Sequence, residues 1–560
     1  MIRFSVLTPV YDPVPEHLAE CAASVRRQRS IDPARFEHVL VDDGSADPAV
    51  GAQLDALAAT GAKVHRRPAN GGIVAASADA LTQASGEWVV LLDHDDVLAD
   101  DALARLDAAI VAHPEATVVY SDHDQLRPDG RRAEPAYKPD FSPERLRQHN
   151  WITHLVAARR DAVERLGGFR AGTDGAQDHD LLLRLMEAGA QFAHVAEVLA
   201  HWRQSPASVA TDTANKPTAF LNGLEVVRAH LERAGVDARA LPGEHPGTYR
   251  IRRAVPHDTL VSVVIPTRGS QGRVWGCRRT FVVDAVASLA RRSSHAALEF
   301  VVVADADTPP DVLVALERVA GDAALPIRLV PYDEPFNFSR KVNVGVAAAS
   351  AEHVLILNDD TELIEHHSIT AMLGLLRSGS AGAPAYGDVG AVGAKLLYHD
   401  GTLQHGGHVY HGEFMHALLG YPGDHPGPGR MLAVDRECAG VTAAALLTTR
   451  AVFDAVGGFP EDLPLHFNDV EFCLAVRAHG HRIVWTPHAS WYHFEGKSRS
   501  RGATLDEWNR VARRWWPDGI PHDPYSNPNL TPKRDDWLEL PGRSGAPPYY
   551  VDEGGTQRWA

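Results

Sequence analysis

Two groups of aspartates stand where an apolar run of the sequence gives way to polar residues. Asp42 and Asp43 follow one such run, and Asp93, Asp95 and Asp96 follow another. Carboxylate oxygens are hard ligands that suit Mg²⁺ or Mn²⁺. A cation held by few protein oxygens keeps positions free for phosphate oxygens, so it neutralises a diphosphate and helps it to leave. The alternative is that these aspartates only cap the helices that follow them.

Alternating strands and helices are expected to position these carboxylates. The strands are near-continuous β-branched runs, such as 88–92, which is typical of strands buried on both faces. Amphipathic helices are expected between them, for example over 14–29 and 49–60. This alternation predicts an α/β fold with a parallel sheet and helices on both sides. Ligands of such sheets bind beyond the carboxyl ends of the strands, where the aspartates lie.

A series of landmarks occurs twice along the chain in the same order, beginning with a proline that ends a strand. The spacing between the two copies grows stepwise, as loop insertions would produce. The pairs are Pro9 and Pro266, 38–47 and 300–309, 87–96 and 352–361, 167–169 and 457–459, 177–185 and 468–476, and His201 and His493. We therefore expect two homologous domains, 1–245 and 259–516. They are joined by a Pro/Gly/His-rich stretch and followed by an irregular tail over 517–560.

The composition of the 560 residues excludes several classes of protein. Apolar residues make up 44% and charged residues 23%, the balance of a folded globular protein. The formal net charge of −17 argues against nucleic acid as a partner, because non-specific nucleic-acid binding needs a basic surface. The four cysteines form no CxxC pair, which argues against a zinc or disulfide framework and favours a reducing compartment. We expect neither an N-terminal targeting signal nor a membrane-spanning helix.

The motifs, taken in order, carry a resemblance to a known family. TPVY, VDDGS, LLDHDD, GGF, QDHDL and HWR resemble the N-terminal half of a family 2 glycosyltransferase with the GT-A fold. The second half is similar to the rhamnosyltransferase-like enzymes of that family, through PFNFSRKVNVG, LNDDTEL, VGAKLLYHDGTLQHGG, GVTAA, GGF, FNDVEFCL, IVWTPHASWYH and DPYSNPNL. The whole resembles the tandem glycosyltransferases of bacterial surface-polysaccharide and O-antigen synthesis. The resemblance implies two tandem GT-A domains, which are Rossmann-like.

In the first half the resemblance assigns roles residue by residue. Asp178 matches the catalytic base, Asp95 the metal-binding aspartate, and His201 a histidine near the diphosphate or the metal. The positions that match nucleotide-sugar contacts are Thr8, Pro9, Tyr11, Asp43, Asp93 and Arg203. Two structural alternatives stay open, namely Asp178 as a helix N-cap and His201 as a half-buried residue packed beside its tryptophan neighbour.

The second half has counterparts for most of these positions. Asp469 matches the base, and Asp360 and His493 match the metal ligands. The nucleotide-sugar positions are Pro266, Asp305, Asp359, Lys497 and Arg499, the last two as a basic pair on the diphosphate. For this basic pair the alternative is a solvated loop.

Several residues depart from the family pattern. Gln177 and Asn468 replace the acidic residue before the base, while Arg268, Ala304 and Asn358 replace Tyr11, Asp42 and Asp93 in the second half. These changes leave the nucleotide preference of the second half open. We expect two working sites, and the alternative is one catalytic domain plus a degenerate sugar-binding domain.

The expected reaction follows from these groups. A UDP- or dTDP-sugar binds with its diphosphate on Mg²⁺ or Mn²⁺, and Asp178 or Asp469 takes the proton of an acceptor hydroxyl. A single displacement inverts the anomeric carbon. The resemblance implies a glycan or lipid-linked glycan as acceptor, which places the enzyme in the cytoplasm or peripherally at the inner face of the membrane.

Other classes of function predict different sequence features. A nicotinamide dehydrogenase needs a GxGxxG turn after the first strand, which the sequence lacks. A sugar-binding protein has no need of the two retained bases, and a glycoside hydrolase leaves the strand-end aspartates unexplained. A nucleotidyltransferase releases pyrophosphate, so turnover of nucleotide sugars with metal and with EDTA separates these classes.

Overall fold

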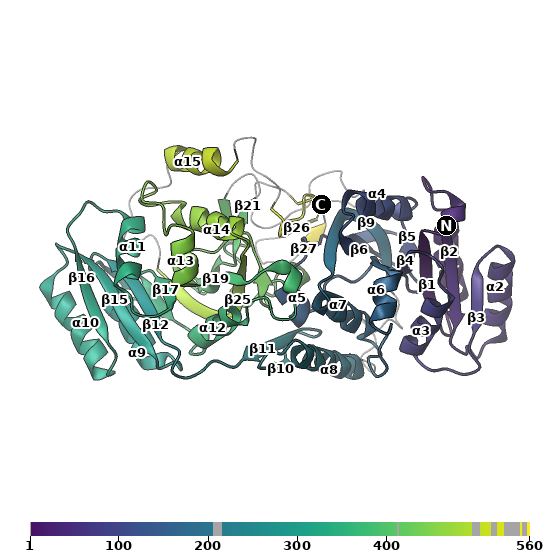
Figure 1. Cartoon of the computed structure of the whole chain (residues 1–560), viewed down its shortest axis with the longest axis horizontal. Coiled ribbons are helices and arrows are strands. Elements are labelled where there is room, and N and C mark those ends of the chain that lie inside the picture. Colours follow the sequence, from purple (N-terminus) through teal and green to yellow (C-terminus); the bar gives the residue numbers. More distant parts are fainter. Residues whose placement is uncertain are drawn as a thin grey trace.

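The structure is a computed structural model that describes residues 2–204, 216–410, 414–494, 505–516, 523–530, 549–551 and 557–559. Two large sheets lie side by side along the long axis of the molecule, one in each half (Figure 1). The amphipathic helices predicted over 14–29 and 49–60 are present as α1 (Pro15–Arg26) and α2 (Pro48–Ala59), and each begins with a proline at its first turn.

The first sheet is formed by nine strands. They are β1 (Phe4–Val10), β2 (Phe36–Asp42), β3 (Lys63–Arg66), β4 (Trp88–Leu91), β5 (Val97–Leu98), β6 (Ala116–Leu126), β7 (Arg132–Ala136), β8 (Val156–Arg159) and β9 (Gln191–Arg203). The other helices of this half are α3 (Ile73–Gln83), α4 (Ala102–Ala112), α5 (Pro143–Gln148), α6 (Arg160–Arg165), α7 (Gln177–Glu187) and α8 (Lys216–Arg233).

The second sheet is formed by ten strands. They are β12 (Val261–Thr267), β15 (Leu298–Asp305), β16 (Ile327–Tyr332), β17 (His353–Leu357), β18 (Thr361–Leu363), β19 (Val389–Leu397), β20 (Leu403–His405), β23 (Arg436–Glu437), β24 (Ala445–Thr449) and β25 (Arg482–His493). Its helices are α9 (Phe281–Arg292), α10 (Pro310–Asp322), α11 (Phe338–Ala348), α12 (Ser368–Ser378), α13 (Arg450–Ala455), α14 (Asn468–Ala478) and α15 (Leu505–Trp515).

The strand orders of the two sheets correspond one to one. The first runs β3-β2-β1-β4-β8-β6-β9-β5 and the second runs β16-β15-β12-β17-β24-β19-β25-β18. This agreement explains the repeated landmarks, because each landmark stands at the end of an equivalent strand or beside an end of an equivalent helix. The α/β fold is confirmed, although each sheet is mixed. The first four strands of each order are parallel, and β8 and β24 run antiparallel to both of their neighbours.

The join between the halves has regular secondary structure. The hairpin of β10 (Ala238–Pro242) and β11 (Tyr249–Arg253) fills most of the stretch predicted as a linker, so the expected boundary at residue 245 falls in its turn. The tail is not wholly irregular where it is described, because residues 523–530 pack between the halves and β26 (Tyr549–Val551) pairs with β27 (Gln557–Trp559). Further short hairpins are β13 (Gln271–Val274) with β14 (Cys277–Thr280), and β21 (His408–Tyr410) with β22 (Phe414–His416).

Buried ion pairs hold the two halves against each other. Glu437 of the second half accepts hydrogen bonds from the Ser142 hydroxyl and from Arg482, each at 2.5 Å. Glu144 of the first half pairs with Arg253 at 2.5 Å, and both glutamates are fully buried. In the tail, the side-chain amide of Asn527 donates to the Asp122 carboxylate at 2.8 Å. Arg482 of the second half also lies 3.4 Å from Glu144 of the first half, so separating the halves would break this buried ion pair.

Candidate active sites

The acidic turn after β4 brings two carboxylates and an imidazole together. The Asp96 amide donates to the Asp93 carbonyl at 3.2 Å, which closes a turn over 93–96. His154 Nδ1 lies 3.0 Å from Asp96 Oδ2, and potential ligand atoms of Asp93, Asp96 and His154 all lie within 4.8 Å of one another. Two carboxylate oxygens and one imidazole nitrogen form a donor set that suits Mn²⁺ and tolerates Mg²⁺. The residues present therefore fit the expected cation.

Asp95 and His201 lie beside this cluster and do not form part of it. The Asp95 carbonyl accepts a hydrogen bond from Arg203 Nε at 2.8 Å, while its carboxylate occupies the third position of the turn. His201 Nδ1 is bonded to Asp124 at 2.6 Å. Arg203 also pairs with Glu20, so in this structure its guanidinium is bound within the protein. The metal roles of Asp95 and His201 and the phosphate role of Arg203 remain predictions.

Asp178 is the second residue of α7, and its side chain is only partly exposed. It does not form a side-chain cap at the start of this helix, so the structural alternative of an N-cap is not what the structure shows. Burial and then the negative charge of Asp93 raise the pKa of its carboxyl to about 6. The influence of Asp93 places Asp178 within electrostatic reach of the acidic turn, where a base has to act. A carboxyl with this pKa is largely ionised at pH 7, as a general base requires.

Asp43 is held in a fixed position at the end of β2. Its carboxylate accepts hydrogen bonds from the Gly71 amide at 2.9 Å and the Gly72 amide at 2.8 Å, and it pairs with Arg67. Gly72 has φ of +86°, which a residue with a side chain rarely adopts. Arg67 was not anticipated from the sequence, because it belongs to neither the repeated landmarks nor the quoted motifs.

The end of β1 and the residue that follows it contain the remaining predicted contacts of the first half. Thr8 is fully buried and its hydroxyl lies 3.0 Å from His38 Nε2, so its side chain faces the interior. The Pro9 carbonyl lies 3.3 Å from His94 Nδ1. Tyr11 is 47% exposed at the end of the strand. Of these residues, Tyr11 therefore offers the side chain that is open to a nucleotide.

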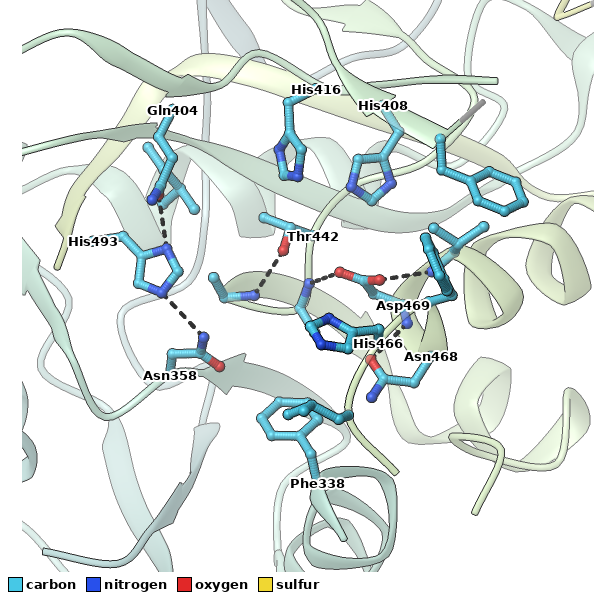
Figure 2. Close-up of a pocket in the computed structure, with 17 residues that line it drawn as sticks. Phe338, Asn358, Gln404, His408, His416, Thr442, His466, Asn468, Asp469 and His493 are labelled. Carbon is cyan, nitrogen blue, oxygen red and sulfur yellow. Dashed lines mark hydrogen bonds between the residues drawn. The ribbon is translucent and has the colours of Figure 1, made fainter. Parts of the chain in front are cut away.

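In the second half a pocket of about 160 Å³ surrounds Asp469. Figure 2 shows His408 and His416 along one side of the pocket and Asn358 and His493 on another. Asp469 is the second residue of α14, as Asp178 is of α7. Its Oδ2 accepts the Ala443 amide at 3.1 Å, and its Oδ1 accepts the Val470 amide at 2.9 Å. The two predicted bases thus occupy equivalent places in equivalent folds.

Asp360 and His493, which were both predicted as metal ligands, lie next to each other. His493 Nε2 lies 3.2 Å from Asp360 Oδ1 and 3.2 Å from the Asn358 amide nitrogen, while His493 Nδ1 lies 2.7 Å from Gln404 Oε1. Asn358 therefore offers an amide where the first half has a carboxylate. Among the residues that the structure describes, Asp360 and His493 belong to no group of three convergent ligands. This site fits a hard cation less well than the acidic turn of the first half.

A buried lysine links the predicted nucleotide contacts of the second half. Lys341 Nζ lies 2.7 Å from Asp305 Oδ1 and 2.6 Å from the Thr267 carbonyl, and the Thr267 hydroxyl donates to Asp359 at 2.7 Å. Burial lowers the pKa of Lys341, while Asp305 opposes that shift. Lys341 lies in the motif PFNFSRKVNVG, to which the sequence assigned no role. Pro266 precedes Thr267 at the end of β12.

Two predicted residues lie outside the described part of the chain, and one histidine of the cation cluster was not predicted. Lys497 and Arg499 lie outside the described part of the chain, so their diphosphate role remains a prediction. His154, which the sequence did not single out, lies 58 residues beyond Asp96 and matches no repeated landmark. In the structure it lies two residues before β8.

A cavity of about 470 Å³ lies between the two halves, and two of its lining residues adjoin His154 of the cation cluster. Thr153 and Trp202 line it from the first half, Met431 from the second and Tyr525 from the tail. The Trp202 ring stacks on His154 at 5.7 Å between centroids. The cavity thus reaches the wall of the cation cluster, and its other side is built by the second half.

Both halves match models of one family of enzymes. Residues 5–166 match Glycosyl transferase family 2 and residues 256–516 match Glycosyltransferase like family 2, and the two matches together cover more than half of the chain. The chain therefore belongs to glycosyltransferase family 2, with one domain of that family in each half. This confirms the expected fold of two tandem GT-A domains and the expected class of enzyme.

Two relatives align along nearly the whole chain. An uncharacterized protein of Sinorhizobium fredii is 37% identical over 548 residues, which are 95% of this chain and 58% of the relative. The O-antigen biosynthesis protein RfbC of Myxococcus xanthus is 33% identical over 540 residues, which are 94% of this chain and 40% of the relative. The chain thus spans about half the length of these two proteins.

Among solved structures, residues 1–349 of S. aureus TarS are 20% identical, with a TM-score of 0.33, over 42% of this chain and 65% of that one. This similarity is too low to support a comparison of sites. In the described parts of the chain, every helix is too short or too polar to span a membrane.

Proposed function

We propose that the chain is an inverting, metal-dependent glycosyltransferase with an active site in each half. The observation that carries the proposal is the equivalence of Asp178 and Asp469. Each is the second residue of its helix, in equivalent domains of a glycosyltransferase family. In this proposal each carboxylate accepts the proton of an acceptor hydroxyl, whose oxygen then attacks the anomeric carbon from the face opposite the leaving diphosphate.

A divalent cation in the first half would be held by Asp93, Asp96 and His154, and Asp95 remains a predicted ligand. Bound there, it supplies positive charge that stabilises the leaving diphosphate. Arg203 donates its backbone N–H to Asp96 Oδ1 at 3.0 Å and so orients this carboxylate. This support from outside the ligand shell fixes which oxygen faces the cation.

The donor in this proposal is a UDP- or dTDP-sugar, and the acceptor is a glycan or a lipid-linked glycan. The family of both halves and the name of the Myxococcus relative support these classes. For the first half, the cavity between the halves is the proposed route of the acceptor. Its volume of about 470 Å³ is typical of ligand pockets, which span roughly 300–1,000 Å³. Because the proposed acceptor is linked to a lipid, we propose that the enzyme acts in the cytoplasm, at the inner face of the membrane.

Nucleotide release from a panel of nucleotide sugars tests this proposal. We expect turnover with Mn²⁺ or Mg²⁺ and its loss with EDTA. Asp178→Asn and Asp469→Asn should each remove one transfer, by about 10²–10⁴-fold, the usual contribution of a general base. The exposed aspartates Asp161 and Asp454, replaced by Asn, serve as controls. Full turnover by the double base variant would refute both assignments.

The alternative is that only the first half is catalytic and the second binds sugar. The replacement of the first acidic ligand by Asn358 favours this alternative. In that case Asp469→Asn would leave every transfer unchanged, while the chain would still bind glycan through the second half.

A further inference from the structure

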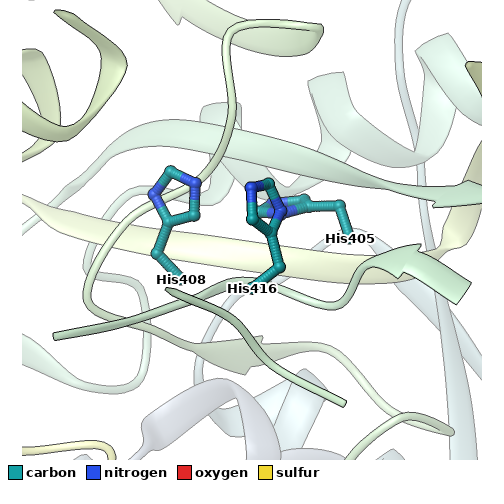
Figure 3. A group of neighbouring side chains, drawn as sticks. All are labelled: His405, His408 and His416. Carbon is teal, nitrogen blue, oxygen red and sulfur yellow. The ribbon is translucent and has the colours of Figure 1, made fainter. Parts of the chain in front are cut away.

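Three histidines converge at the wall of the pocket that holds Asp469. His405 ends β20, and His408 and His416 pair across the two strands of the β21–β22 hairpin. Figure 3 shows the three rings gathered at one point. Their centroids lie 4.9–5.0 Å apart, and potential ligand nitrogens of all three lie within 4.8 Å of one another. The strands thus bring together three imidazoles that are close neighbours in sequence.

The backbone fixes the positions of these rings. Gly406 and Gly407 connect the first two histidines, and Gly407 has φ of +95°. A Cβ at Gly407 would lie 3.1 Å from Arg436 Nη2 and 3.2 Å from Cys438 Cβ, so the turn needs glycine. The His408 amide donates to the Gly440 carbonyl at 2.7 Å, which anchors the start of β21. Rigid support of this kind is what a metal site needs.

His405 and His408 are buried, and burial disfavours a charged imidazole. A neutral imidazole has a lone pair on one nitrogen, and three such rings suit Zn²⁺ and its neighbours much better than Mg²⁺.

We propose that His405, His408 and His416 form a binding site for a divalent transition metal of the zinc class. The Nδ1 atoms of His405 and His416 lie 2.8 Å apart. Two ligands of tetrahedral zinc lie about 3.4 Å apart for bonds of about 2.0–2.1 Å, so the two rings must separate by about half an ångström. The side chain of His416 is only partly buried, which leaves room for this adjustment.

One proton has to move when the metal enters. The Thr442 amide donates to His405 Nε2 at 3.3 Å, so the proton of this ring is on Nδ1 and points towards His416. With the metal on Nδ1, the proton moves to Nε2 and the long bond from Thr442 is lost. The ring is neutral before and after, so no net proton is released.

The location of the site gives it a role in the second half. His408 and His416 line the pocket of Asp469, so the fourth position of a metal on these rings opens into that pocket. Three protein ligands with one open position are typical of catalytic rather than structural zinc sites. The open position suits an oxygen of a hydroxyl or a diphosphate. In the second half Asn358 stands in place of the first acidic ligand. A metal on these imidazoles would supply the cation there instead.

Metal binding by the untagged full-length chain tests this inference without any donor or acceptor. After removal of metal by chelation, Co²⁺ is titrated in the presence of excess Mg²⁺, which occupies the acidic turn. We expect one Co²⁺ per chain with the visible absorption of a tetrahedral ion, displaced by one equivalent of Zn²⁺. X-ray absorption at the zinc edge should show three imidazole nitrogens.

Variants identify the ligands. His408→Gln and His416→Gln should each weaken Co²⁺ binding at least 100-fold, whereas the exposed His366→Gln should leave it unchanged. Melting curves check that the variants fold. The inference is overturned if the wild-type chain binds no transition metal, or if His408→Gln and His416→Gln bind Co²⁺ as tightly as the wild type. Nucleotide-sugar turnover is measured separately, so failure of the proposed function is distinguished from failure of the metal site.

Discussion

Replacing Asp178 by Asn is expected to stabilise the protein above pH 7 even though it removes the proposed base of the first half. Burial and the charge of Asp93 raise the pKa of this carboxyl to about 6 in the folded chain. In the unfolded chain the pKa is about 3.9. Ionisation of Asp178 therefore opposes folding, and the amide of Asn removes that opposition without changing the shape of the side chain.

The sign and size follow from linkage. A carboxyl whose pKa is raised by folding contributes stability that is fully present below about pH 4, and this contribution is lost as the pH rises through about 6. A pKa difference of about 2 corresponds to about 3 kcal/mol at about 1.4 kcal/mol per pKa unit. The side chain keeps partial contact with solvent, so we expect about 1–3 kcal/mol. For a domain of this size that is a rise of several degrees in melting temperature, at about 2–4 °C per kcal/mol.

Thermal melting at pH 5 and pH 8 measures this effect. In EDTA the Asp178→Asn variant should melt several degrees above the wild type at pH 8 and close to it at pH 5. Mn²⁺ should reduce the gain, because a cation on Asp93 cancels the charge that raises the pKa. Asp161→Asn is the control, since Arg165 lowers the pKa of Asp161 and its loss changes stability little and in the opposite direction. If the melting temperature of Asp178→Asn falls, or rises equally at both pH values, the raised pKa of the Asp178 carboxyl is refuted.

Other substitutions test the remaining contacts. Glu437→Gln should lower the free energy of unfolding by about 3–5 kcal/mol in urea titrations, because it breaks the short buried pair with Arg482 and leaves that guanidinium only its longer contact with Glu144. Lys341→Met should raise the donor KM of the second half at least tenfold with little change in kcat, since Lys341 holds Asp305; an unchanged KM would remove that role. Asn358→Asp should strengthen Mn²⁺ binding in the second half, measured by calorimetry, because it adds a carboxylate beside Asp360; equal affinity would show that this place holds no cation.

The fold was largely predictable because its information is local. Several of the repeated landmarks combine a buried strand with the polar residues at its end, and the others mark helix ends, so their order predicts the order of the central elements. The antiparallel direction of β8 and β24 could not be read in this way. Their pairing with β4 and β17 depends on contacts between distant segments, which leave no periodic pattern in the strands themselves.

The candidate sites were predictable in type more than in atomic detail. The sequence pointed to the turn after β4, but it favoured Asp95 where the structure brings Asp96 to Asp93. Which carboxylates of a four-residue turn converge depends on its hydrogen bond, and the bond from the Asp96 amide places the first and fourth side chains together. His154 and Lys341 reach their partners through the tertiary fold alone. A single sequence holds no signal for such contacts.

The two halves share a topology but present different donor atoms at the same place. The first half offers the carboxylates of Asp93 and Asp96, and the second offers the amide of Asn358 beside His493. Oxygen ligands favour Mg²⁺ or Mn²⁺, whereas imidazole nitrogens favour softer ions. The predicted base is present in both halves, while the candidate cation ligands differ. If both sites are catalytic as proposed, we expect them to use different donors or different metals rather than to duplicate one reaction.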